Sequence, residues 1–383
     1  MMKIVIAPDS FKGSLSAKDV AENIKIGVLR VYKDIDIQCV PMADGGEGTV
    51  QSLVDATGGK ILSARVKGPL LKEVDAFYGI LGDGKTAVIE MAAASGLPLV
   101  ADNQRNPMIT TTYGTGELIK HALDMDCREI IIGIGGSATN DGGFGMAKAL
   151  GAKFLDQEGL DIGHGGGSLS KLYKIDISEM DKRIKDCKIT VACDVDNPLC
   201  GPRGATYIFG PQKGAQGEML EILDKNLEHY AKIIKSTLNI DIKDSPGAGA
   251  AGGLGGGLMA FMDVKLQKGI DIVIETVKLD EYMKGADLVI TGEGMIDYQT
   301  QYGKTPYGVA KAAKKYNIPV VALVGQIGKN ANVLYDMGID SIFSLVDGPM
   351  SLENAITKSA DLLQDAAERI IRLYKIARQI KSN

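Results

Sequence analysis

Short apolar runs alternate with helical patterns at both ends of the 383-residue chain, and this alternation constrains the fold more than any other feature. Near the N-terminus, KIVIA (3–7) predicts a buried strand, residues 16–32 a helix capped by Ser16, and residues 35–41 a second strand. The C-terminal part repeats the pattern, with expected strands over 286–292, 318–325 and 341–347 and expected helices over 305–316 and 351–380. Such alternation is typical of a parallel, doubly wound sheet.

The middle of the chain follows a different pattern. Residues 61–91 contain three strand-like runs in series, which predict antiparallel hairpins. Mixed elements follow, with helices near 116–125 and 143–150 and strands over 129–134 and 188–193. We therefore expect an α/β protein with one domain built from both chain ends, 1–72 plus 285–383. A second α/β domain, 73–284, is inserted, and we expect the active site in the cleft between the two.

Composition argues against several classes of function. The net charge is −5 and no basic run carries interleaved aromatic residues, so we expect no nucleic-acid partner. The most apolar stretch, residues 248–262, is too short and too rich in glycine for a membrane span of about 20 residues. The N-terminus begins with a strand pattern, which is unlike a signal peptide. Five cysteines without a CxxC pair are typical of reduced thiols, so we expect a cytoplasmic protein without a zinc site.

The stretch GIGGSATNDGG (133–143) follows a predicted strand and is richer than a simple turn requires. Backbone N–H groups of Gly135, Gly136 and Ser137 can bind an anion at the start of the next helix. Thr139, Asn140 and Asp141 add side-chain ligands, and an acid beside a phosphate needs a cation between them. We interpret the loop as a phosphate or Mg-nucleotide site. The alternative is a connection whose glycines permit positive φ and whose Asn and Asp cap the helix.

Acidic loops recur where predicted strands end. They contain Asp9, then Asp44 with Glu47, then Asp194 with Asp196, and lastly Glu293 with Asp297. Ligands of open α/β sheets bind beyond the carboxyl ends of the strands, so these loops can converge on one site. Carboxylates gathered there imply Mg²⁺, a general base, or both. Lys12, Lys213 and Lys304 are cationic partners of the kind that phosphoryl transfer needs around the migrating group.

Six motifs together resemble the bacterial type I glycerate kinase family, in order and over almost the whole chain. They are APDSFKGSLSA, PMADGGEGT, GIGGSATNDGG, DVDNPLCGPRGA, FGPQKGA and ITGEGMIDYQTQYGKTPYGVA. The resemblance implies ATP-dependent phosphorylation of D-glycerate with Mg²⁺. It also implies a flavodoxin-like domain that is interrupted by an inserted α/β domain, in agreement with the patterning.

Chemistry assigns roles to the residues of these loops. Asp194 is the first choice for the catalytic base, since it directly follows a strand and Asn197 can orient the acceptor, and Asp9 is the second choice. Lys12 is the third catalytic residue, since with Ser10 it can hold the glycerate carboxylate or a phosphate. Substrate-binding residues are Ser10, Gly13, Asn197, Ser137 and Thr139, and nucleotide-binding residues are Gly135, Gly136, Asn140, Thr300 and Lys304. Metal ligands are Glu293 and Asp297, then Asp141, Asp44 and Glu47.

Two other functions compete with this interpretation. An oxidoreductase would use GIGGSA (133–138) for a dinucleotide, with Asp156 or Glu158 on the ribose, but it leaves the acidic loops at 194–196 and 293–297 unexplained. A non-catalytic sensor would bind glycerate or a nucleotide without turnover. The sequence leaves open whether the 2- or the 3-hydroxyl is phosphorylated, which carboxylate is the base, and whether the chain forms a homo-oligomer.

Overall fold

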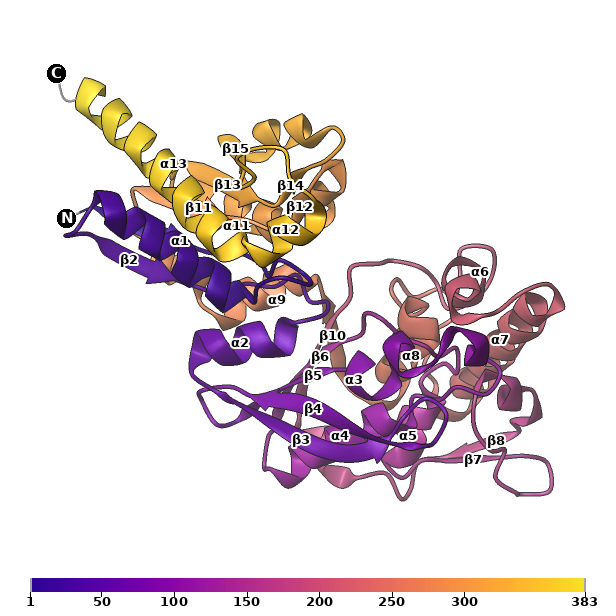
Figure 1. Cartoon of the computed structure of the whole chain (residues 1–383). Helices are drawn as coiled ribbons and strands as arrows, with labels where there is room; N and C mark the ends of the chain where they lie inside the picture. Colours follow the sequence, from indigo (N-terminus) through magenta and orange to yellow (C-terminus); the bar gives the residue numbers. More distant parts are fainter. Residues whose placement is uncertain (1, 382–383) are drawn as a thin grey trace. The chain divides into compact units, whose positions relative to one another are not determined.

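The computed structural model describes residues 2–381, which form two compact units. Unit 1 contains residues up to 44, residues 51–58 and residues 270 onward, and unit 2 contains residues 45–50 and 59–269. The chain is therefore an α/β protein with one unit built from both ends and the other inserted, as Figure 1 shows by colour. The first limit differs from the expected boundary at 72/73 because strand β3 (Lys60–Lys67) pairs within the sheet of unit 2. The second lies at 269/270 instead of the expected 284/285.

The sheet of unit 1 has five parallel strands in the order β15-β13-β11-β1-β2. Their bounds are β1 Lys3–Ile6, β2 Asp36–Cys39, β11 Leu288–Thr291, β13 Val320–Val324 and β15 Ser341–Ser344. Numbered within the unit, this order is 2-1-3-4-5, which is the flavodoxin-like order. The direction of winding reverses beside β1, so the crevice between the carboxyl ends of β1 and β11 is the expected ligand position.

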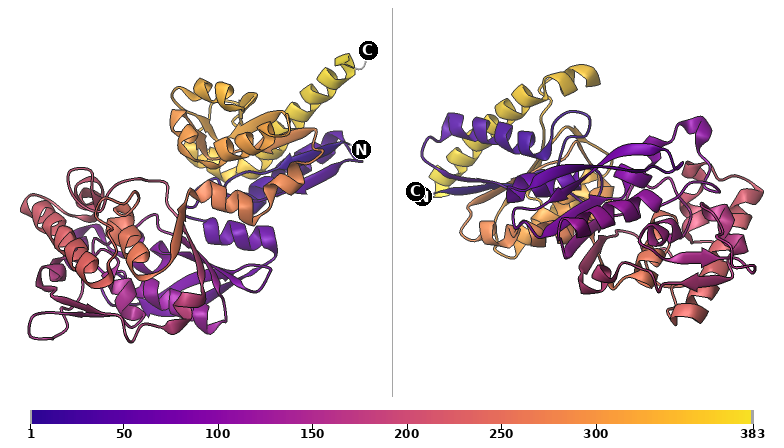
Figure 2. Two further views of the ribbon diagram at one scale, coloured as in Figure 1. Left: turned by 180° about the vertical axis from the view of Figure 1, so that it is seen from behind. Right: turned by 90° about the horizontal axis from the view of Figure 1, so that it is seen from below.

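Helices cover the sheet of unit 1 and bury its centre. Helix α1 (Ala17–Val31) begins where expected, because the Ser16 hydroxyl accepts a hydrogen bond from the backbone N–H of Asp19. It packs beside α13 (Ser359–Lys381), and all views in Figures 1 and 2 keep these two helices together. Ile4 and Ile6 lie in the core that these helices close, while Val5 is fully buried as well. Strand β1 is thus covered on both faces, as parallel strands require.

The sheet of unit 2 has six strands in the order β10-β9-β6-β5-β4-β3. Besides β3, these are β4 Glu73–Ile80, β5 Thr86–Glu90, β6 Glu129–Gly133, β9 Lys188–Ala192 and β10 Val264–Gln267. The meander predicted over 61–91 is confirmed, because β3, β4 and β5 pair antiparallel in series. The strands β5, β6, β9 and β10 are parallel, so their carboxyl ends share one edge.

The remaining elements surround these sheets. Their bounds in unit 2 are α3 Ala92–Ser95, α4 Tyr113–Asp124, α5 Phe144–Ala149, β7 Lys153–Leu155, β8 Lys174–Asp176, α6 Ala205–Phe209, α7 Glu218–Leu238 and α8 Ala250–Phe261. Those outside it are α2 Thr49–Thr57, α9 Gly269–Thr276, α10 Leu279–Met283, β12 Met295–Ile296, α11 Thr305–Lys314, β14 Gln326–Ile327 and α12 Leu352–Thr357. Short 3₁₀ turns over Leu97–Leu99, Asp102–Gln104, Gly166–Lys171, Lys182–Asp186, Pro211–Lys213, Tyr298–Tyr302 and Ala331–Met337 complete the chain.

One segment differs from the sequence expectations, and another has an unusual backbone. The terminal helix expected over 351–380 is two helices, α12 and α13, and Lys358 lies between them. The glycine-rich helix α8 is broken near its start, because Ala251, Gly252 and Gly253 all have positive φ. Among residues 2–381, we find no helix with the length and apolar character that crossing a membrane requires.

Candidate functional site

The loops that follow β1 and β11 are joined by backbone hydrogen bonds beyond the ends of the two strands. The N–H of Ala7 donates to the carbonyl of Ile290 (2.8 Å), and the N–H of Asp9 donates to the carbonyl of Gly292 (2.8 Å). The Thr291 hydroxyl also donates to the carbonyl of Ala7 (2.8 Å). The predicted loops 9–13 and 293–304 therefore meet at the crevice where the winding of the sheet reverses.

Asp9 is held in place through both carboxylate oxygens. Its Oδ1 accepts hydrogen bonds from the N–H (2.6 Å) and the hydroxyl (3.3 Å) of Ser10, and its Oδ2 accepts one from the Thr305 hydroxyl. Burial raises the pKa of Asp9 to about 6, and the nearby charge of Asp44 acts in the same direction. The hydrogen bonds and the Lys12 ammonium lower this pKa but do not cancel the effect of burial.

Glu293 is a second perturbed acid in the same region. Its Oε1 accepts a hydrogen bond from the Thr300 hydroxyl (2.7 Å), and its Oε2 lies 3.4 Å from the Lys304 ammonium. Burial raises the pKa of Glu293 to about 7 against the lowering effects of Lys304 and Thr300, while the charge of Asp9 raises it further. Because Asp9 acts on the pKa of Glu293, the two acids share one electrostatic environment. Pairs of perturbed acids beside cations are typical of functional sites.

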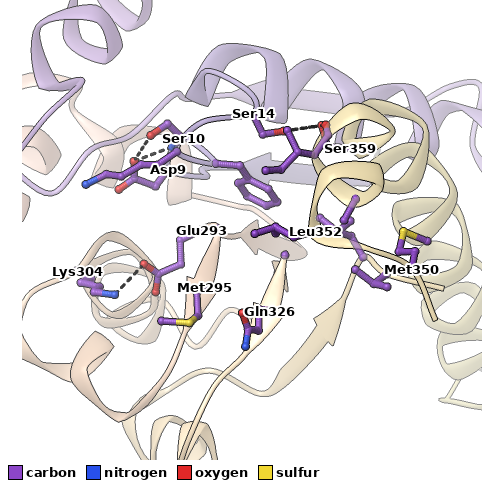
Figure 3. Close-up of a pocket in the computed structure, with 18 of the residues that line it drawn as sticks. Asp9, Ser10, Ser14, Glu293, Met295, Lys304, Gln326, Met350, Leu352 and Ser359 are labelled. Atoms are coloured by element: carbon purple, nitrogen blue, oxygen red, sulfur yellow. Dashed lines mark hydrogen bonds and ion pairs between the residues drawn. The ribbon is translucent and has the colours of Figure 1, made fainter. Parts of the chain in front are cut away.

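A cavity of about 640 Å³ opens at this position in unit 1. Its polar side is lined by Asp9, Ser10, Lys12, Asp44, Glu293 and Lys304. Its other side is apolar and is lined by Phe11, Leu345, Val346, Met350, Leu352 and Ile356. Figure 3 shows the two sides, with Asp9, Glu293 and Lys304 at one end and Met350 and Leu352 at the other. The volume lies in the range of small-ligand sites, which is roughly 300–1,000 Å³.

Asp297 caps a 3₁₀ turn in the loop that carries Glu293. Its side chain accepts a hydrogen bond from the N–H of Gln299 (2.8 Å) at the start of a 3₁₀ turn. In return, the N–H of Asp297 donates to the Thr300 hydroxyl (3.3 Å). Because the Thr300 hydroxyl also donates to Glu293, Thr300 connects the Asp297 cap of this turn to the Glu293 carboxylate.

The loop 133–143 lies in unit 2, and its ends differ in exposure. Gly135 and Gly136 are exposed, and Gly136 has a φ of +75°. Thr139, Asn140 and Asp141 have no exposed surface. The amide of Asn140 donates to the Thr206 hydroxyl (2.9 Å), so this side chain lies in the interior of the unit.

Asp141 is a buried carboxylate with several donors around it. The backbone N–H groups of Thr112 (2.8 Å) and Gly143 (3.0 Å) donate to it, as do the hydroxyls of Thr111 and Thr112. Burial raises its pKa, and these hydrogen bonds oppose the rise. The arrangement fits a structural acid that fixes the loop, and it leaves little room for the predicted metal role.

Lys213 is completely buried behind the same loop. Its ammonium donates to the Ser137 hydroxyl (2.6 Å) and to the carbonyl of Thr139 (2.7 Å). Burial lowers the pKa of Lys213 to about 7, although the charge of Asp141 opposes the change. Lys213, the lysine of the motif FGPQKGA, therefore stabilises the loop 133–143 from the interior of unit 2.

Asp194 and Asn197 follow β9 in unit 2. Oδ1 of Asp194 accepts a hydrogen bond from the N–H of Gly269 (3.1 Å), and the side chain is exposed. The amide of Asn197 donates to the carbonyl of Arg203 (2.8 Å) within the same loop. Neither residue lines the cavity that contains Asp9. The role of Asp194 as the base stays a prediction.

The other predicted residues occupy turns. Gly13 has a φ of +76° and open space around it, in the turn that carries Lys12. Glu47 is exposed in unit 2, and its charge raises the pKa of Glu90. Among residues 2–381, no three His, Cys, Asp or Glu side chains form a group that could hold a metal ion by themselves.

Sequence reasoning missed three features of these sites. Thr305 was expected only to open a helix, yet it binds Asp9. Glu90, at the end of the strand TAVIE, accepts the N–H of Val50 (2.8 Å) at the start of α2, and an acid at the end of an apolar strand was the available signal. The apolar wall around Leu345–Ile356 carries no reactive side chain, so nothing in its residue types indicated a site.

Comparisons with known proteins agree on one family. The model described as "Glycerate kinase family" matches residues 4–375. A glycerate kinase of Bacillus subtilis (strain 168) is 55% identical over 98% of this chain and 99% of its own length. A glycerate 2-kinase of Escherichia coli (strain K12) is 54% identical over 96% of this chain and 97% of its own. A crystal structure from Salmonella typhimurium LT2, with the provisional name glycerate kinase 2, superimposes with a TM-score of 0.92 at 50% identity and covers 99% of both chains.

Proposed function

The chain belongs to the glycerate kinase family, and on that basis we propose that it transfers the γ-phosphoryl group of ATP to the 2-hydroxyl of D-glycerate. The products are ADP and 2-phosphoglycerate. The choice of the 2-hydroxyl is supported by the Escherichia coli relative, which is named a glycerate 2-kinase and matches almost the whole chain. The five free cysteines fit a reducing compartment, so we place the reaction in the cytoplasm.

One observation carries the assignment of the reaction to unit 1. Asp9 and Glu293, two acids with raised pKa values, line the same cavity as Lys12 and Lys304. The cavity lies where the winding of the sheet reverses, which is the usual ligand position in this architecture. Phosphoryl transfer needs such a combination, since a base must accept a proton while cations stabilise charge on the migrating group.

Asp9 is the proposed general base. Ser10 and Thr305 fix its carboxylate, and a pKa of about 6 keeps it mostly ionised at pH 7 while leaving it a better proton acceptor than an ordinary aspartate. When the glycerate hydroxyl oxygen bonds to the γ-phosphorus, its proton passes to Asp9, and the bond from this phosphorus to the departing ADP oxygen breaks. Lys12 and Lys304 are positioned to bind the phosphoryl oxygens.

A magnesium ion fits the donor set of the cavity. Mg²⁺ in nucleotide enzymes usually takes one or two carboxylates and completes its shell with phosphates and water. Asp44 and Glu293 provide such a pair at the polar side. The charge of Asp44 raises the pKa of Asp9 and the charge of Asp9 raises that of Glu293, and a bound cation would compensate this repulsion. Bound there, the ion would neutralise phosphate charge. Asp297 and Asp141 are not part of this proposal, because their carboxylates fix local backbone.

The exposed amides of Gly135 and Gly136, at the carboxyl end of β6, stay candidates for an anion in unit 2. The Ser137 hydroxyl and the Thr139 carbonyl instead accept hydrogen bonds from Lys213, and the Asn140 amide donates to the Thr206 hydroxyl. We therefore give the substrate and nucleotide roles chiefly to unit 1, through Ser10, Lys12 and Lys304.

The test is a product analysis. The protein is incubated with ATP, Mg²⁺ and D-glycerate, and phosphorus NMR distinguishes 2-phosphoglycerate from 3-phosphoglycerate. We expect 2-phosphoglycerate in amounts equal to the ADP formed. A 3-phosphoglycerate product would correct the position, and binding of both substrates without ADP would support a sensor. A change of NADH fluorescence on mixing, without any phosphorylated product, would support the oxidoreductase alternative.

A further inference from the structure

The cavity in unit 1 has an apolar side that the chemistry of phosphoryl transfer leaves unused. Leu352 and Ile356 lie four residues apart on α12, on the same face of that helix, with exposed fractions of 76% and 39%. Phe11, Leu345 and Val346 continue this surface toward the floor of the cavity. Exposed apolar surface that continues into a cavity is typical of a binding site.

The two sides of the cavity are fixed by one short turn. Lys12 lies in this turn and faces the polar side, and Ser14, two residues later, holds the helices that form the apolar wall. The Ser14 hydroxyl lies 2.7 Å from that of Ser359 at the start of α13 and 3.3 Å from the carbonyl of Ile356. Figure 3 shows the contact between Ser14 and Ser359 beside the cavity. A ligand with one anionic and one apolar end would therefore meet a rigid pair of contacts.

Resting on the proposed function, we propose that this apolar side binds the purine ring of ATP. Of the two substrates, glycerate is a small polar anion without an apolar face, whereas ATP joins a flat apolar base to an anionic phosphate chain. The same two properties are joined in the cavity, whose polar side carries Lys12 and Lys304. The purine lies between Phe11, Val346, Leu352 and Ile356, and the phosphates extend toward the two lysines.

The direct test uses tryptophan as a local reporter, because the chain contains none. Leu352→Trp places a single indole at the apolar side, and Ile376→Trp, at an exposed site of α13 outside the cavity, is the matched control. We expect ATP and adenosine to quench the Leu352→Trp fluorescence by at least a fifth, while inorganic triphosphate and D-glycerate leave it unchanged. The Ile376→Trp fluorescence should respond to none of the four.

A second variant perturbs the site. Ile356→Glu puts a carboxylate beside the expected purine on a half-exposed helix face, which tolerates glutamate. The ratio of the KM for ATP to the KM for D-glycerate should rise at least tenfold, whereas Ile376→Glu should leave this ratio at the wild-type value.

The outcomes separate this inference from the proposed function. Active protein whose Leu352→Trp fluorescence ignores saturating ATP, or responds to D-glycerate instead, would overturn the purine assignment and leave the kinase activity standing. If ATP and adenosine quench the Leu352→Trp fluorescence but the wild-type protein forms no phosphoglycerate, the purine site would be supported and the proposed reaction overturned. An unchanged KM ratio in Ile356→Glu would count against the purine site in either case.

Discussion

The hydroxyl of Thr305 donates a hydrogen bond to Oδ2 of Asp9 across 296 positions of the chain. Thr305 begins α11, and Asp9 follows β1, so the contact joins the two chain ends that form unit 1. It orients the carboxylate that we assign as the base. It also lowers the pKa of this carboxylate against the effect of burial, and so helps to keep the base ionised at neutral pH.

Replacing the proposed base should affect catalysis far more than replacing the acid that the sequence favoured first. We expect Asp9→Asn to lower kcat by roughly 10²–10⁴-fold, because the hydroxyl proton loses its acceptor. Asp194→Asn should change kcat much less, since Asp194 is exposed and its Oδ1 binds the N–H of Gly269. Steady-state kinetics with saturating ATP and D-glycerate compare the two. The reverse order of effects would make Asp194 the base.

The Thr305 hydroxyl should set the acidic limb of the pH profile. Its hydrogen bond lowers the pKa of Asp9, so Thr305→Val should raise this pKa above about 6. The acidic limb of kcat/KM should then move to higher pH, while Thr305→Ser, which keeps the hydroxyl, should retain the wild-type limb. Profiles between pH 5 and 9 measure the shift. Identical limbs in Thr305→Val and wild type would show that Asp9 does not govern them.

The buried charge of Asp9 should cost stability at neutral and higher pH. The pKa of Asp9 rises from 3.8 to about 6 on folding, so its stabilising contribution is complete below pH 3.8 and is lost as the pH rises through 6. Asp9→Asn carries no charge, so it should exceed wild type in free energy of unfolding by about 1–3 kcal/mol at pH 8 and by almost nothing at pH 4.

Urea unfolding at pH 4, 6 and 8 measures this difference. Asp34→Asn, at an exposed turn, is the matched control and should show no such trend with pH. If Asp9→Asn differed from wild type by the same amount at all three values, the cause would not be the ionisation of Asp9.

Gly252 should be essential for the interior of unit 2. Its φ is +68°, and a Cβ there would lie 1.9 Å from the carbonyl oxygen of Thr139. Gly252→Ala should therefore lower the free energy of unfolding by about 3–5 kcal/mol, from backbone strain plus overpacking. Gly285→Ala is the control, since Gly285 has a φ of +73° but nothing within 4 Å of the added carbon, and it should cost about 1 kcal/mol. Equal losses in urea unfolding would mean that only the φ matters.

The sequence predicted the sheet of unit 1 well, because apolar β-branched runs and capped helices are local signals. Strand β1 and the start of α1 at Ser16 lie where expected. The position of Asp9 and Glu293 beyond the strand ends followed from the same pattern, since parallel strands place their carboxyl ends at one edge. The sequence could not predict that one cavity is lined by Asp9, Lys12, Glu293 and Lys304, because it gives no distances between loops.

Hydrogen-bond partners could not be predicted, and they divide residues that look alike in the sequence. Asp297 and Asp141 sit in glycine-flanked acidic loops, as Asp9 does, yet the first caps a turn and the second is buried among threonine donors. The apolar wall on α12 was equally hidden, because exposed leucine and isoleucine side chains on a helix carry no chemical signature. Loop chemistry thus indicates candidates, whereas burial and partners decide among them.

The pairing of β1 with β11 has a consequence for biosynthesis. Ile6 aligns with Ile290, so β1 lacks its neighbour β11 until just over three quarters of the polypeptide has been translated. All of unit 2 is complete by residue 269, so it can fold on the ribosome before β11 is available to pair with β1. Glu293 and Lys304 are added only after that point, and an unfinished nascent chain therefore has no complete site with which to consume ATP.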